Sequence, residues 1–84
     1  MIITRKTVHD KLVAYLNHKT TLPELVTWAE ESMSEGDLDP RDAPILREVI
    51  ARIGLADVKA FGLSWEDCSD FLFRLGYKVE VVTA

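Results

Sequence analysis

Apolar residues recur every three or four positions through most of this 84-residue chain, which is the spacing of helices with one buried face. The clearest example lies between Phe61 and Gly76. Ser64 can cap a helix, Asp67 can return a bond to the cap, and Gly76 can end the helix in the left-handed conformation. The pattern therefore predicts a helix over 65–75, with Tyr77 packed back over its last turn. The predicted buried face comprises Trp65, Cys68, Phe71, Leu72 and Leu75.

The first helix has two candidate starting points. Thr4 and Thr7 can each act as N-cap, and Thr7 with Asp10 has the spacing of a capping box. An apolar stripe follows, and we expect the helix to end before Thr20 and Thr21. The predicted stripe consists of Val8, Leu12, Tyr15 and Leu16.

The second helix has a well-marked beginning. Thr21 and Glu24 have the spacing of a capping box, and Pro23 falls in the first turn, where no amide bond is lost. The helical pattern runs to about Ser34 and is expected to stop at Gly36, followed by a polar connection over 37–40. The predicted buried face is Leu22, Leu25, Val26, Ala29 and Met33.

The start of the third helix is a choice between Asp39 and Asp42 as N-cap. A start at Asp39 would place Pro44 inside the helix, at a cost of about 3 kcal/mol. A start at Asp42 leaves Pro44 in the first turn, so Asp42 is the preferred cap. The side chains expected to face inward are Leu46, Val49, Ile50 and Ile53.

The end and the outer face of this third helix are also predictable. Gly54 is expected to end it, with Leu55 packed back across the cap. On the outer face, Glu48 and Arg52 have the i,i+4 spacing of a favourable ion pair.

Beyond the fourth helix, Tyr77 to Val82 alternates like a half-buried strand. A lone strand needs a partner, and Met1 to Thr4 is the other candidate in the chain. A chain of this length has too few residues for a second core. We therefore expect residues 1–84 to form one domain of the mainly α class. The predicted architecture is a compact four-helix domain with a short C-terminal β-strand that can pair with the N-terminal residues.

The composition is that of ordinary globular protein, with 48% hydrophobic and 29% charged residues. Arg5 and Lys6 follow the first apolar residues at once, so we expect no signal peptide. No run approaches the ~20 apolar residues that span a bilayer, so no membrane partner is expected. Cys68 is the single cysteine, which rules out an internal disulfide. The expected location is the cytoplasm.

The net charge of −4 is unevenly distributed along the chain. Residues 1–20 carry a net +3, whereas residues 21–42 hold seven acidic side chains against the single Arg41, a net −6. Nucleic-acid binding needs a basic face, so an acidic middle argues against a nucleic-acid partner. An acidic loop is compatible with a basic protein partner, although such loops are usually only solvated.

No set of residues has the spacing of a metal or cofactor site. His9 and His18 are nine residues apart, which places them on opposite sides of one helix. A single cysteine leaves no zinc spacing, and the glycines are scattered without forming a phosphate loop. We therefore expect no cofactor and no metal.

The candidate catalytic groups have simpler structural explanations. Cys68 falls on an apolar helix face, where it is usually a small core residue. Glu66, Asp67 and Asp70 can be interpreted as paired carboxylates for acid–base chemistry, yet all lie near a helix N-terminus, where negative charge is favourable. The sequence predicts that the protein is not an enzyme.

Two aromatic residues lie away from the predicted buried faces. By the 100° rule, Trp28 is about 120° from the centre of its stripe and Phe73 about 140°. Neighbouring elements can cover such residues, but exposed aromatics are enriched at binding hot spots. If both are exposed, they can form a docking patch beside the acidic loop from Glu30 to Asp42. The candidate partner-binding residues are Trp28, Phe73, Glu30, Glu31, Glu35, Asp37 and Asp39.

Four strings of the sequence are similar to a family of small uncharacterised bacterial proteins: AYLNH (14–18), ELVTWAEESM (24–33), DVKAFGLSWEDC (57–68) and FRLGY (73–77). This resemblance covers nearly the whole chain and is most specific over 57–68. It implies a compact, mostly helical domain and transfers no catalytic residue. In layout alone, a small acidic helical chain also resembles bacterial toxin-immunity proteins.

Together these features favour a non-catalytic protein-interaction module, with a protein partner or a second copy of the chain on its surface. The first alternative is an acidic antitoxin or immunity protein that masks a basic toxin, for which salt-sensitive binding is expected. The second alternative, a small enzyme, lacks a coherent residue set and would need a deep polar pocket containing His9 or Cys68.

Overall fold

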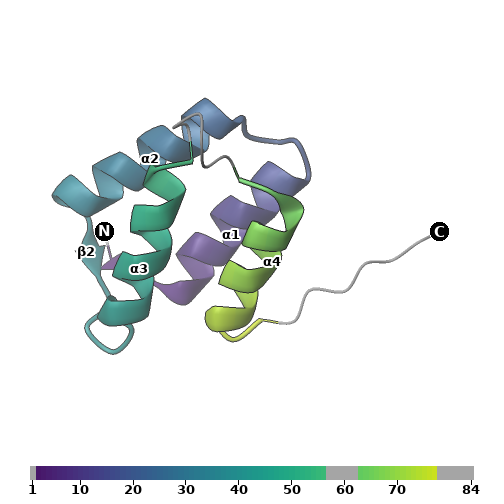
Figure 1. The fold of residues 1–84 in the computed structure, drawn as a ribbon. Helices are drawn as coiled ribbons and strands as arrows, with labels where there is room; N and C mark the ends of the chain where they lie inside the picture. The colour runs from purple at the N-terminus through teal and green to yellow at the C-terminus, as the bar shows by residue number, and fades with distance from the viewer. Residues whose placement is uncertain (1, 57–62, 78–84) are drawn as a thin grey trace.

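The computed structural model describes residues 2–56 and 63–77, and these form four helices and two short strands (Figure 1). In chain order the elements are β1 (Ile2–Ile3), α1 (Arg5–Leu16), α2 (Leu22–Glu35), β2 (Asp37–Leu38), α3 (Ala43–Gly54) and α4 (Trp65–Arg74). The prediction of a mainly α, compact four-helix domain is confirmed. The C-terminal strand predicted over 77–82 lies outside the described residues from residue 78 onward.

Local capping explains where α2 and α4 begin. In α2, the Glu24 amide donates to the Thr21 hydroxyl at 3.3 Å, and the Thr21 amide donates to the Glu24 carboxylate at 3.0 Å. In α4, Ser64 and Asp67 exchange the corresponding two bonds at 3.0 and 3.1 Å. Each box satisfies amides that the first turn leaves unbonded. Both predicted helix starts are confirmed.

The first helix begins at the earlier of its two candidate caps. Thr4 accepts from the Thr7 amide at 3.3 Å, and the Thr7 hydroxyl accepts from the Thr4 amide at 3.1 Å. Thr7 therefore completes the box as its third helical residue. Asp10 does not close a box with Thr7; it pairs with Lys6 at 2.9 Å.

The third helix begins after Asp42, as predicted, with Pro44 in its first turn. The Asp42 carboxylate, however, makes no capping bond to the helix. It accepts instead from Arg5 Nη2 at 2.7 Å, which connects the start of α3 to the start of α1.

The N-terminal residues form a strand whose partner is β2. The two strands are parallel, with Ile2 opposite Asp37 and Ile3 opposite Leu38. The stretch predicted as a polar connection therefore contains a strand. Gly36 allows this close approach, since a Cβ on it would meet the Ile3 side chain and lie 2.6 Å from the Ser32 carbonyl oxygen.

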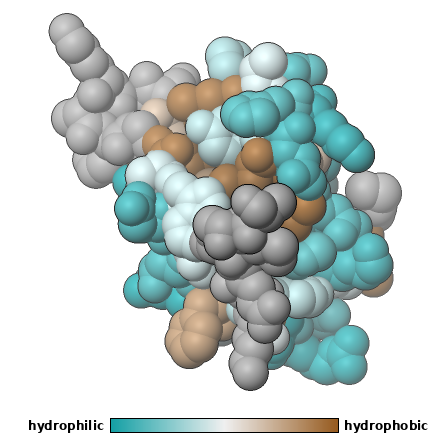
Figure 2. All heavy atoms as spheres, turned by 90° about the vertical axis from the view of Figure 1, so that its right-hand side faces the viewer, coloured by the Kyte–Doolittle hydropathy of each residue, from teal (hydrophilic) through white to brown (hydrophobic). Residues whose placement is uncertain are grey.

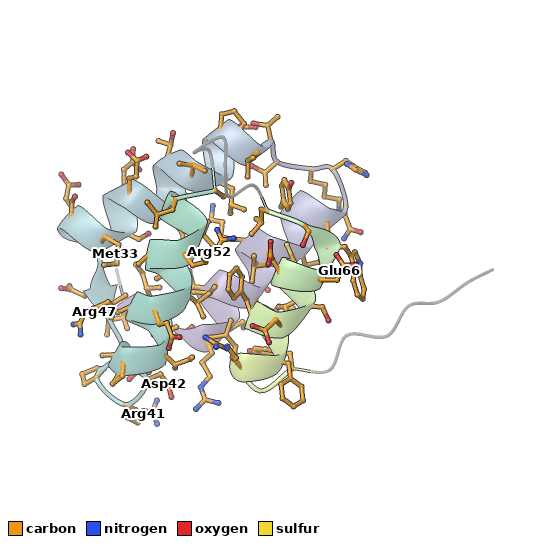
Figure 3. The ribbon with its side chains drawn as sticks, viewed as in Figure 1. Met33, Arg41, Asp42, Arg47, Arg52 and Glu66 are labelled. Carbon is orange, nitrogen blue, oxygen red and sulfur yellow. The ribbon has the colours of Figure 1, made fainter. Side chains whose placement is uncertain are left out.

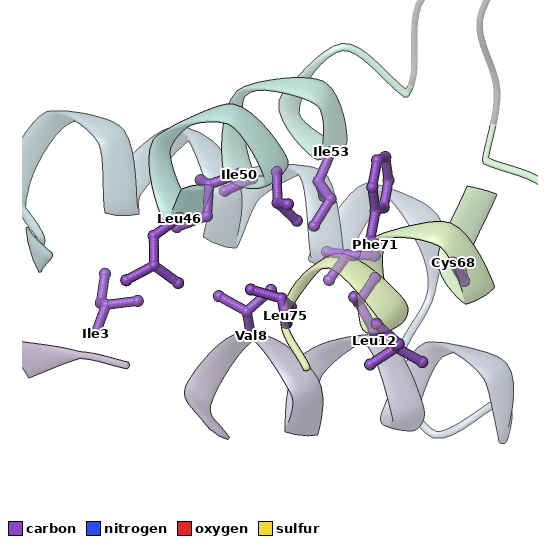
Figure 4. Close-up of a cluster of buried hydrophobic side chains, with 13 residues drawn as sticks. Ile3, Val8, Leu12, Leu46, Ile50, Ile53, Cys68, Phe71 and Leu75 are labelled. Carbon is purple, nitrogen blue, oxygen red and sulfur yellow. The ribbon is translucent and has the colours of Figure 1, made fainter. Parts of the chain in front are cut away.

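The core lies between the four helices (Figure 4). Leu46, Ile50 and Ile53 of α3 face side chains of α1 and α4 across it, and all three are completely buried. Three residues predicted to be covered are not: Met33 is 43%, Trp65 45% and Leu55 48% exposed. They lie in the last turns or at the termini of their helices, where a neighbouring helix no longer covers the apolar stripe.

Charged pairs connect α3 to α4. Glu48 was predicted to pair with Arg52 along α3, but its carboxylate accepts from Arg74 of α4 at 2.6 Å. Arg52 lies 3.7 Å from Asp67, also on α4. Glu48 and Arg52, which could have paired with each other along α3, therefore each pair with a residue of α4.

The end of α4 follows the sequence prediction. Gly76 is in the left-handed region, with φ of 94°, and the Tyr77 amide donates to the Leu72 carbonyl at 2.9 Å. The Tyr77 ring lies 4.3 Å from the His9 ring, measured between centroids. Tyr77 thus packs back over the helix end and against α1.

Candidate partner-binding surface

Trp28 lies half-buried on the side of α2 that faces α1. It packs against the core cluster, while Lys11 Nζ lies 5.7 Å from the centre of its ring. One depression of about 430 Å³ lies between Trp28 and Lys11, with Glu24 and Glu31 at its border. A second, of about 190 Å³, lies between Trp28 and Ile3, bordered by Glu31 and Glu35. The structure therefore brings Trp28 together with two of the predicted acidic residues.

The carboxylates at the end of α2 and in β2 are exposed and have no cationic partner among the described residues. They are Glu30, Glu31, Glu35 and Asp37. Acidic residues of the other helices and of the loop before α3 are paired with arginine or lysine; these are Asp10, Asp39, Asp42, Glu48, Asp67 and Asp70. Negative charge is thus left uncompensated mainly at one end of α2.

The position of Glu35 makes its charge costly. A helix carries partial negative charge at its C-terminus, and the last turn of α2 has no basic residue. Glu35 ends the helix, and Glu31 lies one turn earlier. Acidic side chains at this end lower helix stability by about 0.3–1 kcal/mol each.

Two residues of the predicted acidic loop have structural roles. Asp39 is only 8% exposed, and its carboxylate accepts from the Arg41 amide at 3.0 Å and from Arg41 Nη2 at 3.3 Å. These bonds from Arg41 lower the pKa of the Asp39 carboxyl below its usual value. Asp42 is engaged by Arg5. The Asp39 carboxylate is therefore occupied within its own loop, although we had predicted that it contacts a partner.

Phe73 is 74% exposed, but it projects from a different part of the molecule. It belongs to α4, which packs mainly against α1, whereas α2 packs mainly against α3 (Figure 1). Trp28 and Phe73 therefore lie on separate helices with different neighbours, and Phe73 is not part of the surface around Trp28.

Ile2 and Met33 are exposed apolar residues that the sequence pattern did not identify as part of a surface. Ile2 is 61% and Met33 43% exposed, and both line a depression of about 480 Å³ that also contains Arg47. Met33 and Arg47 lie on the same side of the molecule, beside β2 (Figure 3). The position of Met33 near the end of α2 was the available signal, since stripes are least covered there.

We call this region the α2 acidic surface. It consists of Trp28, Glu31 and Glu35 on one side of α2, of Glu30 and Met33 on the other side near the helix end, and of Asp37, with Ile2 at its border. Its apolar members can fill pockets on a partner, and its carboxylates can accept bonds from lysine or arginine.

The groups that could support catalysis are placed unfavourably for it. Cys68 is completely buried, and burial raises the pKa of its thiol to about 11, with a further contribution from Asp67. The thiol is therefore protonated near neutral pH and lacks nucleophilic character. His9 contacts Tyr77 and Asp10, whereas His18 is exposed in the turn after α1.

Residues 2–56 and 63–77 contain neither a group of metal ligands nor a helix that could span a membrane. Within these ranges no three or more His, Cys, Asp or Glu side chains are grouped so that they could hold a metal ion. None of the helices described there is long and apolar enough to cross a membrane.

Comparisons of the chain with protein-family models, with curated proteins and with solved structures found no match. The resemblance to small bacterial helical proteins therefore stays a prediction.

Proposed function

We propose that this protein is a non-catalytic protein-interaction module that binds a basic partner protein through the α2 acidic surface. The observation that carries the proposal is the group of uncompensated carboxylates at the negative end of α2, directly beside the half-exposed ring of Trp28.

Two observations support a role in binding for these carboxylates. They receive no compensating bond inside the described part of the molecule, and Glu35, in the last turn, opposes the helix dipole. A basic partner would relieve both penalties, because its lysine or arginine side chains supply the missing positive charge. Complementary charge also accelerates association and excludes like-charged partners.

Trp28 supplies the apolar part of the proposed contact. Aromatic side chains next to polar ones dominate the binding energy of many interfaces. Lys11 Nζ lies 5.7 Å from the centre of the ring, so the protein itself already places one cation beside Trp28. A partner arginine entering the adjacent depression would find the ring together with Glu31 and Glu35.

A narrower form of the same proposal is an acidic antitoxin or immunity protein that masks a basic toxin. The net −6 of residues 21–42 favours it, since masking a basic active surface requires concentrated negative charge. In that case one basic protein would bind tightly, and its activity would be lost in the complex. An interaction module with several partners would bind each of them more weakly.

The test reverses the charge at the surface and keeps the net charge matched elsewhere. Tagged wild type, a Glu31→Lys, Glu35→Lys double variant and a Glu66→Lys, Asp70→Lys double control with the same net charge are used to isolate partners, and affinity is then measured with the purified partner. Glu66 is exposed on α4, on the opposite side of the molecule from Met33 (Figure 3). We expect the double variant to lose at least tenfold in affinity, with wild-type binding weakening as salt increases.

Equal affinity of the double variant and the wild type would contradict the proposal. Binding that is insensitive to salt would also contradict it, because a contact built on exposed charges is screened.

A further inference from the structure

A depression of about 550 Å³ lies where the end of α1, the start of α2 and the start of α4 meet. Its apolar lining includes Leu16, Leu22, Leu63 and Trp65. Trp65 is 45% exposed there, although the helical pattern predicts it to be buried. Figure 2 views the molecule from the side of α4 and shows apolar side chains between hydrophilic ones. Depressions of this size, mainly apolar with a few polar groups, are typical of small-molecule sites.

The polar side chains that line this depression divide into engaged and free ones. The Tyr15 hydroxyl donates to the Leu63 carbonyl at 3.3 Å, and the Thr21 hydroxyl takes part in the capping box at the start of α2. The side chains of His18 and Thr20 make no hydrogen bond or ion pair within the described part of the chain. These two groups therefore remain available to a ligand.

His18 occupies a backbone position that favours glycine. Its φ is 60°, in the left-handed region, where a Cβ crowds the backbone. The His18 amide donates to the Tyr15 carbonyl at 3.0 Å, and the Lys19 amide donates to the Ala14 carbonyl at 2.8 Å. Gly76 holds the corresponding position after α4, where the same two kinds of bond end the helix. An imidazole is a costlier choice than glycine in this turn, and its presence indicates a role outside the turn.

The charge around the depression indicates the class of ligand. Among the described residues no acidic side chain lines it, and the exposed Lys19 follows His18 in the chain. The two depressions beside Trp28 are instead bordered by glutamates. A negatively charged head group is therefore repelled near Trp28, whereas at this depression it can accept bonds from His18 and Thr20.

The apolar lining suits the body of such a ligand. The exposed part of the Trp65 indole can pack against another ring, in an offset or edge-to-face arrangement with centroids about 4.5–7 Å apart. A cavity of about 150 Å³ holds a benzene ring. The depression of about 550 Å³ therefore has room for an aromatic ring together with a short side chain and its head group.

We propose that the depression around Leu16, Leu63 and Trp65 binds a small aromatic carboxylate. The ring of the ligand packs against Trp65, and its carboxylate accepts a bond from the His18 imidazole, with the Thr20 hydroxyl as a second donor. This proposal is independent of the α2 acidic surface, because it involves none of the residues of that surface.

The first test is a titration of isotope-labelled protein with benzoate, 3-phenylpropanoate and naphthalene-2-carboxylate, followed by nuclear magnetic resonance. At least one of these probes is expected to shift the Trp65 indole and His18 signals saturably and to leave the Trp28 indole signal in place. The amide of the same probe, which lacks the charge, is expected to bind at least fivefold more weakly. Absence of saturable shifts with all three probes, shifts at Trp28 instead, or equal affinity for acid and amide would overturn the proposal.

Substitution of His18 separates its role in binding from its effect on the fold. His18→Gly removes the imidazole and relieves the left-handed backbone, so the urea midpoint is expected to rise while affinity for the carboxylate probe falls at least fivefold. His9→Gln, which changes the other histidine of the chain, is the matched control and is expected to keep wild-type affinity. Wild-type affinity in His18→Gly would overturn the proposal. A fall in both affinity and stability would also overturn it, because the imidazole would then support the fold.

Discussion

Asp42 illustrates how a side chain can occupy its predicted position and perform a different task. It precedes the first turn of α3, as capping preferences predict, yet its carboxylate binds Arg5 at 2.7 Å. Asp39 and Glu48 behave similarly. The Asp39 carboxylate is paired with Arg41, and the Glu48 carboxylate is paired with Arg74 instead of the predicted Arg52. At the scale of single residues, tertiary neighbours decide what a polar group does.

Gly36 provides a direct test of the contact between β1 and the end of α2. Gly36→Ala is expected to lower the free energy of unfolding by about 1–3 kcal/mol, since the new methyl group would overlap the Ile3 side chain and the Ser32 carbonyl. Gly54→Ala is the control, because its Cβ would meet only the Ala29 Cβ, at 3.9 Å. Urea denaturation measures both, and equal stability of the two variants would contradict the packing described for β1.

Because the Cys68 thiol is buried, the free energy of unfolding is expected to depend on pH in the alkaline range. Its pKa is raised to about 11 in the folded protein, against about 9 for a free thiol. The unfolded chain therefore loses this proton first, and the contribution of Cys68 to stability is lost as pH rises from about 9 to about 11. Below pH 9 the contribution is fully present.

Denaturation of wild type and Cys68→Ala across this range measures the effect. The wild type is expected to lose more stability than the variant between pH 9 and 11. Parallel stability curves for the two proteins would show that the thiol titrates normally, and hence that it is not buried as described.

At the scale of elements, α2 combines a favourable start with an unfavourable end. Its capping box and early proline stabilise the N-terminus, whereas Glu31 and Glu35 lie at the negative end without a basic residue in the last turn. Residues that lower the stability of their own helix are expected at functional sites.

Charge reversal at each end of α2 separates these two effects. Glu35→Lys is expected to stabilise the free protein by about 0.3–1 kcal/mol, since a cation is favourable at a helix C-terminus. Glu24→Lys, the same change at the other end, is expected to destabilise it, because the capping bonds with Thr21 are lost. Thermal denaturation measures both. A loss of stability in Glu35→Lys would show that Glu35 has a structural partner and would remove the argument for its role in binding.

The elements that could be predicted from the sequence are those fixed by local interactions. The capping residues Thr21, Ser64 and Asp67 and the left-handed Gly76 are read from short spacings, and each has its predicted role. The pairing of β1 with β2 brings together residues 35 positions apart, Ile2 and Asp37. Two-residue strands carry no periodicity, so no pattern in the sequence could show this contact.

The candidate surface was predictable only in part, because its extent also depends on how the helices pack against one another. Trp28, Glu31 and Glu35 are spaced along one helix, so the 100° rule could place them near one another. Phe73 was grouped with them because the sequence does not tell how α2 and α4 are arranged. Met33 was assigned to the core because the periodicity does not show where α3 stops covering α2.

At the scale of the whole molecule, the protein has two open surfaces of different character. The α2 acidic surface joins uncompensated carboxylates to Trp28, and the depression around Leu16, Leu63 and Trp65 is mainly apolar. We assign the first to a basic partner protein. Because α2 packs mainly on α3 and α4 mainly on α1, changes at one surface are expected to leave the other intact.

The central claim is that a partner binds at the α2 acidic surface, and a binding footprint by nuclear magnetic resonance tests it most directly. The isolated basic partner is added to isotope-labelled protein while backbone and tryptophan indole signals are recorded. The account predicts that the signals of Trp28, Glu31, Met33 and Glu35 shift, and that those of Trp65 and Phe73 remain in place. Shifts confined to Trp65, Phe73 and their neighbours on α4, with Trp28 unaffected, would contradict it.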